Sequence, residues 1–140
     1  MLAFDVLPSL VSSTEDERLR AAFEEHLGET RAQSERAEGV FRALGLDPSS
    51  NRSAPLEALA KSHDELAGKV VLPALRDAFH AAAAVATERW ELTLYEAAID
   101  LANAMRLDGE AVGLLEQSRA EEHHALLVAE AERRRLLDSV

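Results

Sequence analysis

Two glutamates interrupt the apolar side of a long predicted helix between Leu75 and Arg106. Residues three or four apart share one face of a helix. Glu88 and Glu91 therefore fall on one stripe with largely apolar neighbours, namely Ala81, Ala84, Tyr95, Ala98, Ala102 and Met105. A carboxylate inside a helical core is costly unless it is paired, protonated or bound to a metal. Both glutamates are therefore candidates for metal or proton chemistry, with Glu88 nearer the margin of the stripe.

Two other predicted helices also carry polar residues on their inward sides. In the helix predicted from about Glu15 to Leu44, the stripe is apolar at both ends, whereas its middle holds His26, Thr30 and Gln33, with Glu29 adjacent. The last helix places Glu122 among Ala111, Leu115, Ser118, Ala125, Ala129 and Leu136. Each residue alone has a structural explanation, because a core histidine can be hydrogen-bonded and a marginal glutamate can reach water or an arginine.

The helices that position these residues are bounded by local signals. Residues 2–12 form a short apolar helix, and Thr14 with Glu17 has the spacing of a capping box. Gly45 ends the second helix and Gly68 ends a short amphipathic helix near residues 56–66. Pro73 lies in the first turn of the long helix, and Asp108 caps a last helix that ends near residue 137. The pattern predicts one all-α domain over residues 1–140.

Composition excludes several classes of function. The net charge is −11, from 26 acidic and 15 basic side chains, which argues against nucleic acid or an anionic membrane as the main partner. The chain has no cysteine, and hence no thiolate ligand or nucleophile. It has no apolar run of membrane-spanning length and no signal-peptide pattern at the start. We therefore expect a cytoplasmic protein.

In a four-helix bundle, mid-helix polar residues from three helices converge. Oxygen-rich clusters with one imidazole suit iron or manganese, or a water-filled polar network. The candidate metal ligands are His26, Glu29, Glu88, Glu91 and Glu122. His123 and His124 are predicted to face solvent, although Glu121 and His124 have the Glu-x-x-His spacing of di-metal sites.

The chain resembles the YciE/YciF family of ferritin-like bacterial proteins over about residues 7–130. The resemblance lies in the run AFEEHLGET at residues 22–30 with Gln33 and Glu35-Arg36, and in Arg76-Asp77-Ala78. It continues in Glu88-Arg89-Trp90-Glu91 with Tyr95, and in Leu114-Leu115 before Glu121-Glu122. It implies a ferritin-like antiparallel four-helix bundle with a short extra helix in the crossover, association with stress responses, and a dimer. It also implies an interior carboxylate site, to which Glu29, Glu88, Glu91 and Glu122 correspond.

Three departures from the family pattern weaken that site. An acidic ligand on an earlier first helix would lie before Met1, a histidine is replaced by Arg89, and an aspartate is replaced by Leu126. We therefore expect a degenerate site that binds one iron or manganese ion weakly, or no metal. Arg36 or Arg89 could neutralise the carboxylates instead.

Two functions follow from this reasoning. One is a metal-binding ferritin-like protein, with Tyr95 and Gln33 supporting the ligands. The other is a non-catalytic scaffold or adaptor that acts through dimerisation and partner binding. A shortened first helix leaves an apolar groove, so a homodimer is expected under both. The residues favour a non-enzyme, because Ser62-His63-Asp64 are adjacent on a helix and cannot form a triad.

Overall fold

The computed structural model describes residues 3–48 and 53–140, and every regular element in these ranges is a helix. The five elements are α1 (Ala3–Ser13), α2 (Glu17–Ala43), α3 (Ala54–Ala67), α4 (Pro73–Ala104) and α5 (Gly109–Asp138). In the described ranges, no helix is both long and apolar enough to cross a membrane. The all-α prediction is confirmed.

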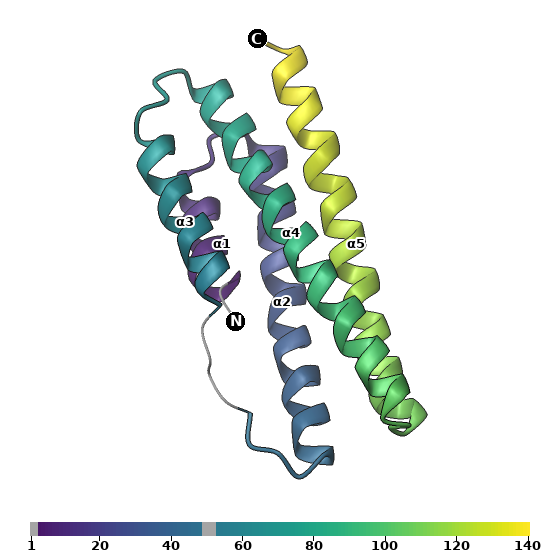
Figure 1. Cartoon of the computed structure of the whole chain (residues 1–140). Helices are drawn as coiled ribbons and strands as arrows, with labels where there is room; N and C mark the ends of the chain where they lie inside the picture. The colour runs from purple at the N-terminus through teal and green to yellow at the C-terminus, as the bar shows by residue number, and fades with distance from the viewer. Residues whose placement is uncertain (1–2, 49–52) are drawn as a thin grey trace.

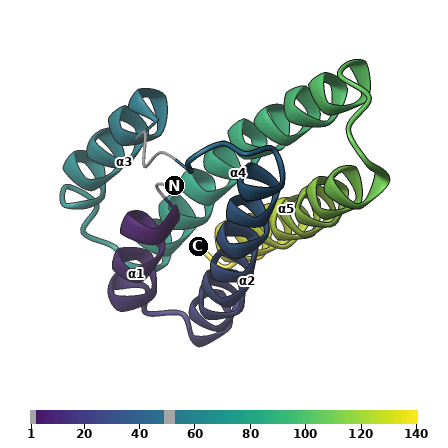
Figure 2. The same cartoon turned by 90° about the horizontal axis from the view of Figure 1, so that it is seen from below.

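Helices α1, α2, α4 and α5 form a four-helix bundle, and α3 lies in the crossover between α2 and α4 (Figure 1). Helices α2 and α4 run in the same direction, while α1 and α5 run against them. The end-on view in Figure 2 shows that α3 flanks the outside of α4, on the side away from α5. The short helix in the crossover was therefore predicted correctly.

Most helix boundaries follow the sequence signals. Pro73 occupies the first turn of α4, and the side chain of Asp108 accepts a hydrogen bond from the Ala111 amide at the start of α5. Gly45 follows α2 with φ of 68°, the left-handed conformation in which glycine carries no steric penalty.

The capping box at Thr14 was wrong. The N-cap of α2 is Asp16, whose carboxylate accepts a hydrogen bond from the Leu19 amide at 2.9 Å. The Thr14 hydroxyl instead donates to the carbonyl of Leu10 at 2.7 Å, at the end of α1. An aspartate two residues later competes for the same free amides, and a charged oxygen is the stronger acceptor.

The apolar core lies where α1 packs onto the other three bundle helices. Its buried members come from α1, α2, α4 and α5, and they are Leu7, Leu10, Leu19, Phe23, Ala78, Ala81, Ala84, Val85, Ala129 and Leu136. Two residues expected on inward stripes are exposed, namely Leu44 at 37% and Met105 at 60%. Both lie at the ends of long helices, beyond the neighbours that would cover them.

Candidate metal centre

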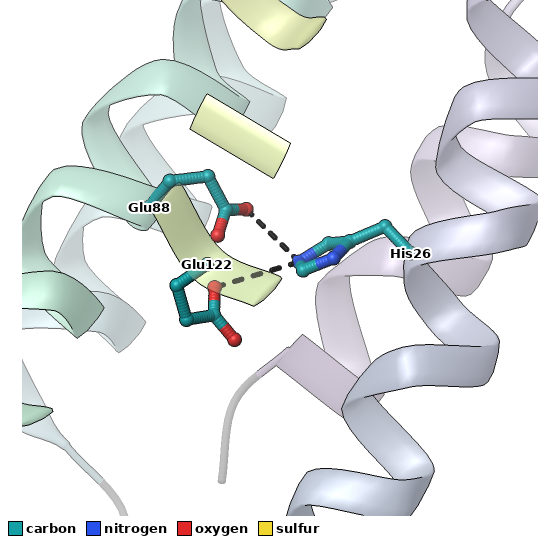
Figure 3. Close-up of side chains that lie close together, drawn as sticks. All are labelled: His26, Glu88 and Glu122. Atoms are coloured by element: carbon teal, nitrogen blue, oxygen red, sulfur yellow. Dashed lines mark ion pairs between the residues drawn. The ribbon is translucent and has the colours of Figure 1, made fainter. Parts of the chain in front are cut away.

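Three helices each bring one buried side chain to a common point in the bundle. His26 comes from α2, Glu88 from α4 and Glu122 from α5, with exposures of 6%, 3% and 0%. Figure 3 shows the two carboxylates facing the same edge of the imidazole. Each residue offers one ligand atom, and the three atoms lie within 4.8 Å of one another. A single small ion could contact all three.

The histidine ring is held from both sides. Nε2 of His26 lies 3.2 Å from Oε1 of Glu88 and 3.7 Å from Oε2 of Glu122. Nδ1 lies 3.3 Å from Oε2 of Glu29, which comes from the next turn of α2. In the neutral ring, Nδ1–H can donate to Glu29, which leaves the lone pair of Nε2 facing the two glutamates. The protonated ring instead donates from both nitrogens.

Glu29 and Glu91 therefore have different places around the site. The side chain of Glu29 is 29% exposed and contacts the far nitrogen of His26, so it orients the ring and does not join the three ligand atoms. Glu91 is buried, and its pKa responds first to that burial, then to the charges of Glu88 and His26 and to the neighbouring Glu122. Glu91 is thus a neighbour of the cluster on the side of α4 facing α5.

The site has a surplus of acceptor atoms. Both oxygens of Glu122, Oε2 of Glu88 and Nε2 of His26 are buried without a hydrogen-bond partner. Buried polar atoms in proteins are nearly always satisfied, so each such atom requires an explanation. A metal ion or a proton shared between carboxyl groups would each supply the missing partner.

The arginines considered as neutralising cations are engaged elsewhere. Arg36 contacts Glu121 and donates through Nε to the hydroxyl of Ser118 at 3.1 Å. Arg89 is exposed and pairs with Glu130 at 2.7 Å. His123 and His124 are exposed, as expected.

Burial and mutual repulsion change the pKa values of the clustered groups. Burial raises the pKa of Glu122, and the adjacent Glu88 raises it further. Burial and the charge of Glu88 likewise raise the pKa of Glu91. Burial lowers the pKa of His26, but the neighbouring carboxylate of Glu88, assisted by Glu29, outweighs it and raises the pKa to about 9. Without a metal, the cluster therefore holds extra protons at neutral pH.

A small pocket connects the cluster with the surface between α2, α4 and α5. Its volume is about 30 Å³, and His26, Glu29, Glu88 and the exposed Glu25 and His124 are among its lining residues. This volume holds about one water molecule. Seven of its twelve lining residues are apolar, so the pocket gives a single water molecule or a dehydrated ion access to the edge of the cluster.

Two buried polar clusters outside the site were missed by the sequence reasoning. Glu132 is 3% exposed and pairs with Arg18 and Arg135, each at 2.7 Å. Its position three residues after Ala129 continues the inward stripe of α5, so the periodicity could have found it. His63 of α3 and His80 of α4 are hydrogen-bonded at 2.9 Å, a contact that required the packing of α3 to be known.

Residues 1–128 match the family described as a domain of unknown function, DUF892. The chain belongs to the DUF892 family. Among curated proteins, none matches it. Two solved structures of this family share its fold. YcfI of Rhodopseudomonas palustris, provisionally described as a structural protein, has a TM-score of 0.87 at 30% identity, over 91% of this chain and 81% of that chain.

The second solved structure is the E. coli stress protein YciF. It has a TM-score of 0.87 at 25% identity, and the match covers 99% of this chain and 87% of YciF. The resemblance to YciE/YciF proteins and the ferritin-like bundle with its crossover helix are therefore confirmed. This family relationship fixes the fold and leaves the chemistry to the residues of the site.

Proposed function

We propose that this member of the DUF892 family is a ferritin-like metal-binding protein associated with stress responses. One iron or manganese ion would be held by Nε2 of His26 and the carboxylates of Glu88 and Glu122, with Glu91 available as a further oxygen ligand. The observation that carries the proposal is the set of buried acceptor atoms on three helices that have no hydrogen-bond partner. Among the described residues, no arginine or lysine side chain contacts these atoms.

The donor set fits these metals. Carboxylate oxygens with one imidazole suit Fe²⁺ and Mn²⁺, whereas structural zinc sites are richer in nitrogen and sulfur. A bound iron or manganese ion would supply one-electron redox chemistry inside the bundle. The residues around it would fix the ring of His26 through Glu29, keep bulk water out, and retain protons on Glu91 and Glu122 until the ion replaces them.

The set of candidate ligands is smaller than the ligand set of a di-metal centre. Such centres use four carboxylates and two imidazoles, whereas the three clustered groups here offer two carboxylates and one imidazole. This composition supports one ion, bound more weakly than in a complete centre. The stress association rests on the name of the YciF relative.

Metal content of the untagged protein tests the proposal. The protein is purified without chelators, its iron and manganese are measured by mass spectrometry, and the apoprotein is titrated anaerobically with Fe(II) and Mn(II). Stoichiometric binding that is lost in Glu122→Gln and retained in Glu116→Gln is expected. Glu116 is an exposed glutamate on the same helix. Equal binding by the two variants, or no titratable site in the wild type, would overturn the proposal.

A metal-free scaffold is the second candidate function. It is favoured by the raised pKa values of Glu91 and Glu122, because protonated carboxyl groups can satisfy one another without an ion. The provisional description of YcfI as a structural protein points the same way. A protein that folds and assembles normally but shows no titratable metal site is the result that selects it.

A further inference from the structure

Helix α3 is attached to the bundle through few buried side chains. Three of its residues are buried, namely Leu56, His63 and Ala67, while Leu66 near its end is 46% exposed. In the part of the chain that the structure describes, the apolar core takes its members from the other four helices, and Figure 2 shows α3 on the outside of α4. An element that buries little apolar surface opens at a lower free energy than the core. Helix α3 is therefore the least firmly held of the five helices.

A pair of buried histidines lies in the contact between α3 and α4. His63 of α3 and His80 of α4 are 5% and 2% exposed, and Nε2 of His63 lies 2.9 Å from Nδ1 of His80. The ring of His63 also stacks on the ring of Phe79 of α4, with centroids 5.2 Å apart. Docking of α3 therefore holds both imidazole rings out of water.

The hydrogen atoms of the neutral histidine pair are fixed by the surrounding groups. Oδ1 of Asp64 lies 3.3 Å from Nδ1 of His63, and a carboxylate can only accept, so this nitrogen carries a hydrogen. Nε2 of His63 is then an acceptor, and Nδ1–H of His80 donates to it. Nε2 of His80 is left with a lone pair, and it is buried without a hydrogen-bond partner. Each neutral ring thus carries its hydrogen on Nδ1.

The docked pair has no suitable place for a further proton. Only one hydrogen fits between two nitrogen atoms that are 2.9 Å apart. A third proton must therefore lie on Nε2 of His80, where a buried N–H group without an acceptor is destabilising. A fourth proton would set two N–H groups and two positive charges against each other. In the undocked state, by contrast, water accepts a hydrogen bond from every ring N–H group.

The charged groups of α3 and α4 do not offset this cost. Burial lowers the pKa of His80, and the charge of His63 lowers it further, with Arg76 acting in the same direction. Asp77 and Asp64 act in the opposite direction. The side chain of Asp64 is 70% exposed, so water screens its charge. The carboxylate of Asp77 accepts hydrogen bonds from two backbone amides of the turn between α1 and α2.

The neighbouring elements add one carboxylate to these groups. Glu15, in the turn between α1 and α2, pairs with Arg76, and its side chain is 58% exposed. Val6 of α1 lines the space beside His63 and carries no charge. The docked pair therefore takes up a further proton less readily than a free histidine, whose ordinary pKa is 6.5. Docking of α3 is at full strength above this pH and weakens as the pH falls below it.

We propose that α3 is released by acid: protonation of the pair formed by His63 and His80 undocks α3 from α4, while α1, α2, α4 and α5 remain folded. The proposal does not depend on metal binding. Release uncovers Thr87 of α4 and Val6 of α1, which line a small space together with α3. The same two residues also line a space that reaches Glu88. Acid would therefore thin the cover on one side of the buried cluster.

Distances between spin labels test the release in this cysteine-free chain. Lys61→Cys on α3 is combined with Ala86→Cys on α4, and the control pair combines Ala86→Cys with Glu24→Cys on α2. All three positions are exposed. By pulsed electron paramagnetic resonance, the first pair is expected to show one narrow distance at pH 7.5 and a longer, broad distribution at pH 5. The control pair is expected to keep its distance. An unchanged first pair, or broadening of both pairs together, would overturn the proposal.

The role of the histidines is tested with the same label pair. His80→Asn retains a donor for His63 but cannot take up the proton, so release of α3 is expected to require a lower pH than in the wild type. His123→Asn is the matched control, because His123 is an exposed histidine on α5, and it is expected to keep the wild-type midpoint. Equal midpoints in the two variants would refute the role of the pair.

Histidine NMR of the wild type gives a readout that needs no substitution in the pair. The Cε1–H resonance of His80 is expected to titrate below its ordinary pKa of 6.5, over the same pH range in which the distance between α3 and α4 changes. Release of α3 while this resonance still reports a neutral ring would show that another group drives the release, and would overturn the proposal.

Discussion

Glu29 and Glu88 lie at opposite nitrogens of one imidazole. Oε2 of Glu29 is 3.3 Å from Nδ1 of His26, while Oε1 of Glu88 is 3.2 Å from Nε2. The first carboxylate belongs to the same helix as the histidine, and the second comes from α4. Glu29 therefore restrains the direction of the ring, and Glu88 shares the space into which Nε2 points.

This arrangement predicts different effects for the two glutamates on metal binding. Glu29→Gln is expected to weaken Mn(II) affinity about 10- to 100-fold at unchanged stoichiometry, as is typical when the partner of a metal-bound histidine is lost. Glu88→Gln is expected to abolish stoichiometric binding. Isothermal titration of both apoproteins measures the difference. Equal loss in both variants would make Glu29 a ligand in its own right.

Metal affinity is expected to increase with pH. Without metal, His26 has a raised pKa of about 9, and burial raises the pKa values of Glu91 and Glu122. These groups must release protons before they can bind an ion. Each released proton adds about one logarithmic unit of affinity per pH unit. Calorimetric titrations between pH 6 and 8, in two buffers of different ionisation enthalpy, give the number of protons released when the metal binds. An affinity that does not change with pH would contradict the assignment of these groups as metal ligands.

Two buried glutamates on α5 predict opposite effects on the stability of the metal-free protein. Glu122 has unpartnered oxygens, so Glu122→Leu is expected to stabilise the apoprotein, because a buried polar group without a partner costs about 1–3 kcal/mol. Glu132 is paired with Arg18 and Arg135, so Glu132→Leu is expected to destabilise it. Urea unfolding of the chelator-treated proteins measures both. Destabilisation by both substitutions would indicate that Glu122 already has a partner.

The histidine pair between α3 and α4 predicts acid sensitivity. Nε2 of His63 lies 2.9 Å from Nδ1 of His80, with Asp64 at Nδ1 of His63. A single proton satisfies the contact between the rings, and a second would set two N–H groups against each other. Burial lowers the pKa of His80, and the charge of His63 lowers it further, against the opposing charge of Asp77.

The direction of this pH effect on stability follows from the lowered pKa of His80. A histidine with a lowered pKa in the folded state stabilises the fold above its ordinary value of 6.5, and this contribution is lost as the pH falls below that value. The thermal midpoint of the wild type is therefore expected to fall more steeply from pH 7.5 to 5.5 than that of His80→Asn. Parallel pH profiles for the two proteins would show that the pair does not titrate in this range.

The sequence predicted the helices well because their boundaries depend on local chemistry. Proline in the first turn of α4, glycine after α2 and aspartate before α5 each act within one turn, and all three were located correctly. The start of α2 was misplaced because Thr14 and Asp16 both have the chemistry of a cap. Only the position of the Thr14 hydroxyl, at the end of α1, separates them.

The site was less predictable because it depends on how the helices are rotated and shifted relative to one another. Helical periodicity placed Glu122 and His26 on the inward faces of their helices. It set Glu88 near the margin of the inward stripe of α4, and the packing of α1 and α2 covers this margin in the structure. Periodicity also could not separate Glu29 from the clustered residues, since Glu29 and His26 are neighbours on one helix. That distinction depends on which ring nitrogen faces α4, which only the assembled bundle defines.

Asp77 connects α4 to the turn between α1 and α2, and this connection gives the last prediction. Its carboxylate accepts hydrogen bonds from the Glu15 amide at 3.2 Å and from the Asp16 amide at 2.7 Å. It is 2% exposed, so removal of the carboxylate leaves two amides without an acceptor. Asp77→Ala is expected to lower the free energy of unfolding by about 2–4 kcal/mol, since each unsatisfied group costs about 1–3 kcal/mol.

Asp108→Ala is the matched control. It removes a cap that accepts one bond, from the Ala111 amide, at an exposed helix start and is expected to cost about 1 kcal/mol. Urea unfolding measures both substitutions. Asp77 lies about 16 Å along α4 from Glu88, so Asp77→Ala should leave the metal stoichiometry of the folded protein unchanged. Equal destabilisation by the two variants would show that the turn finds other acceptors, and that Asp77 does not fix the start of α2 against α4.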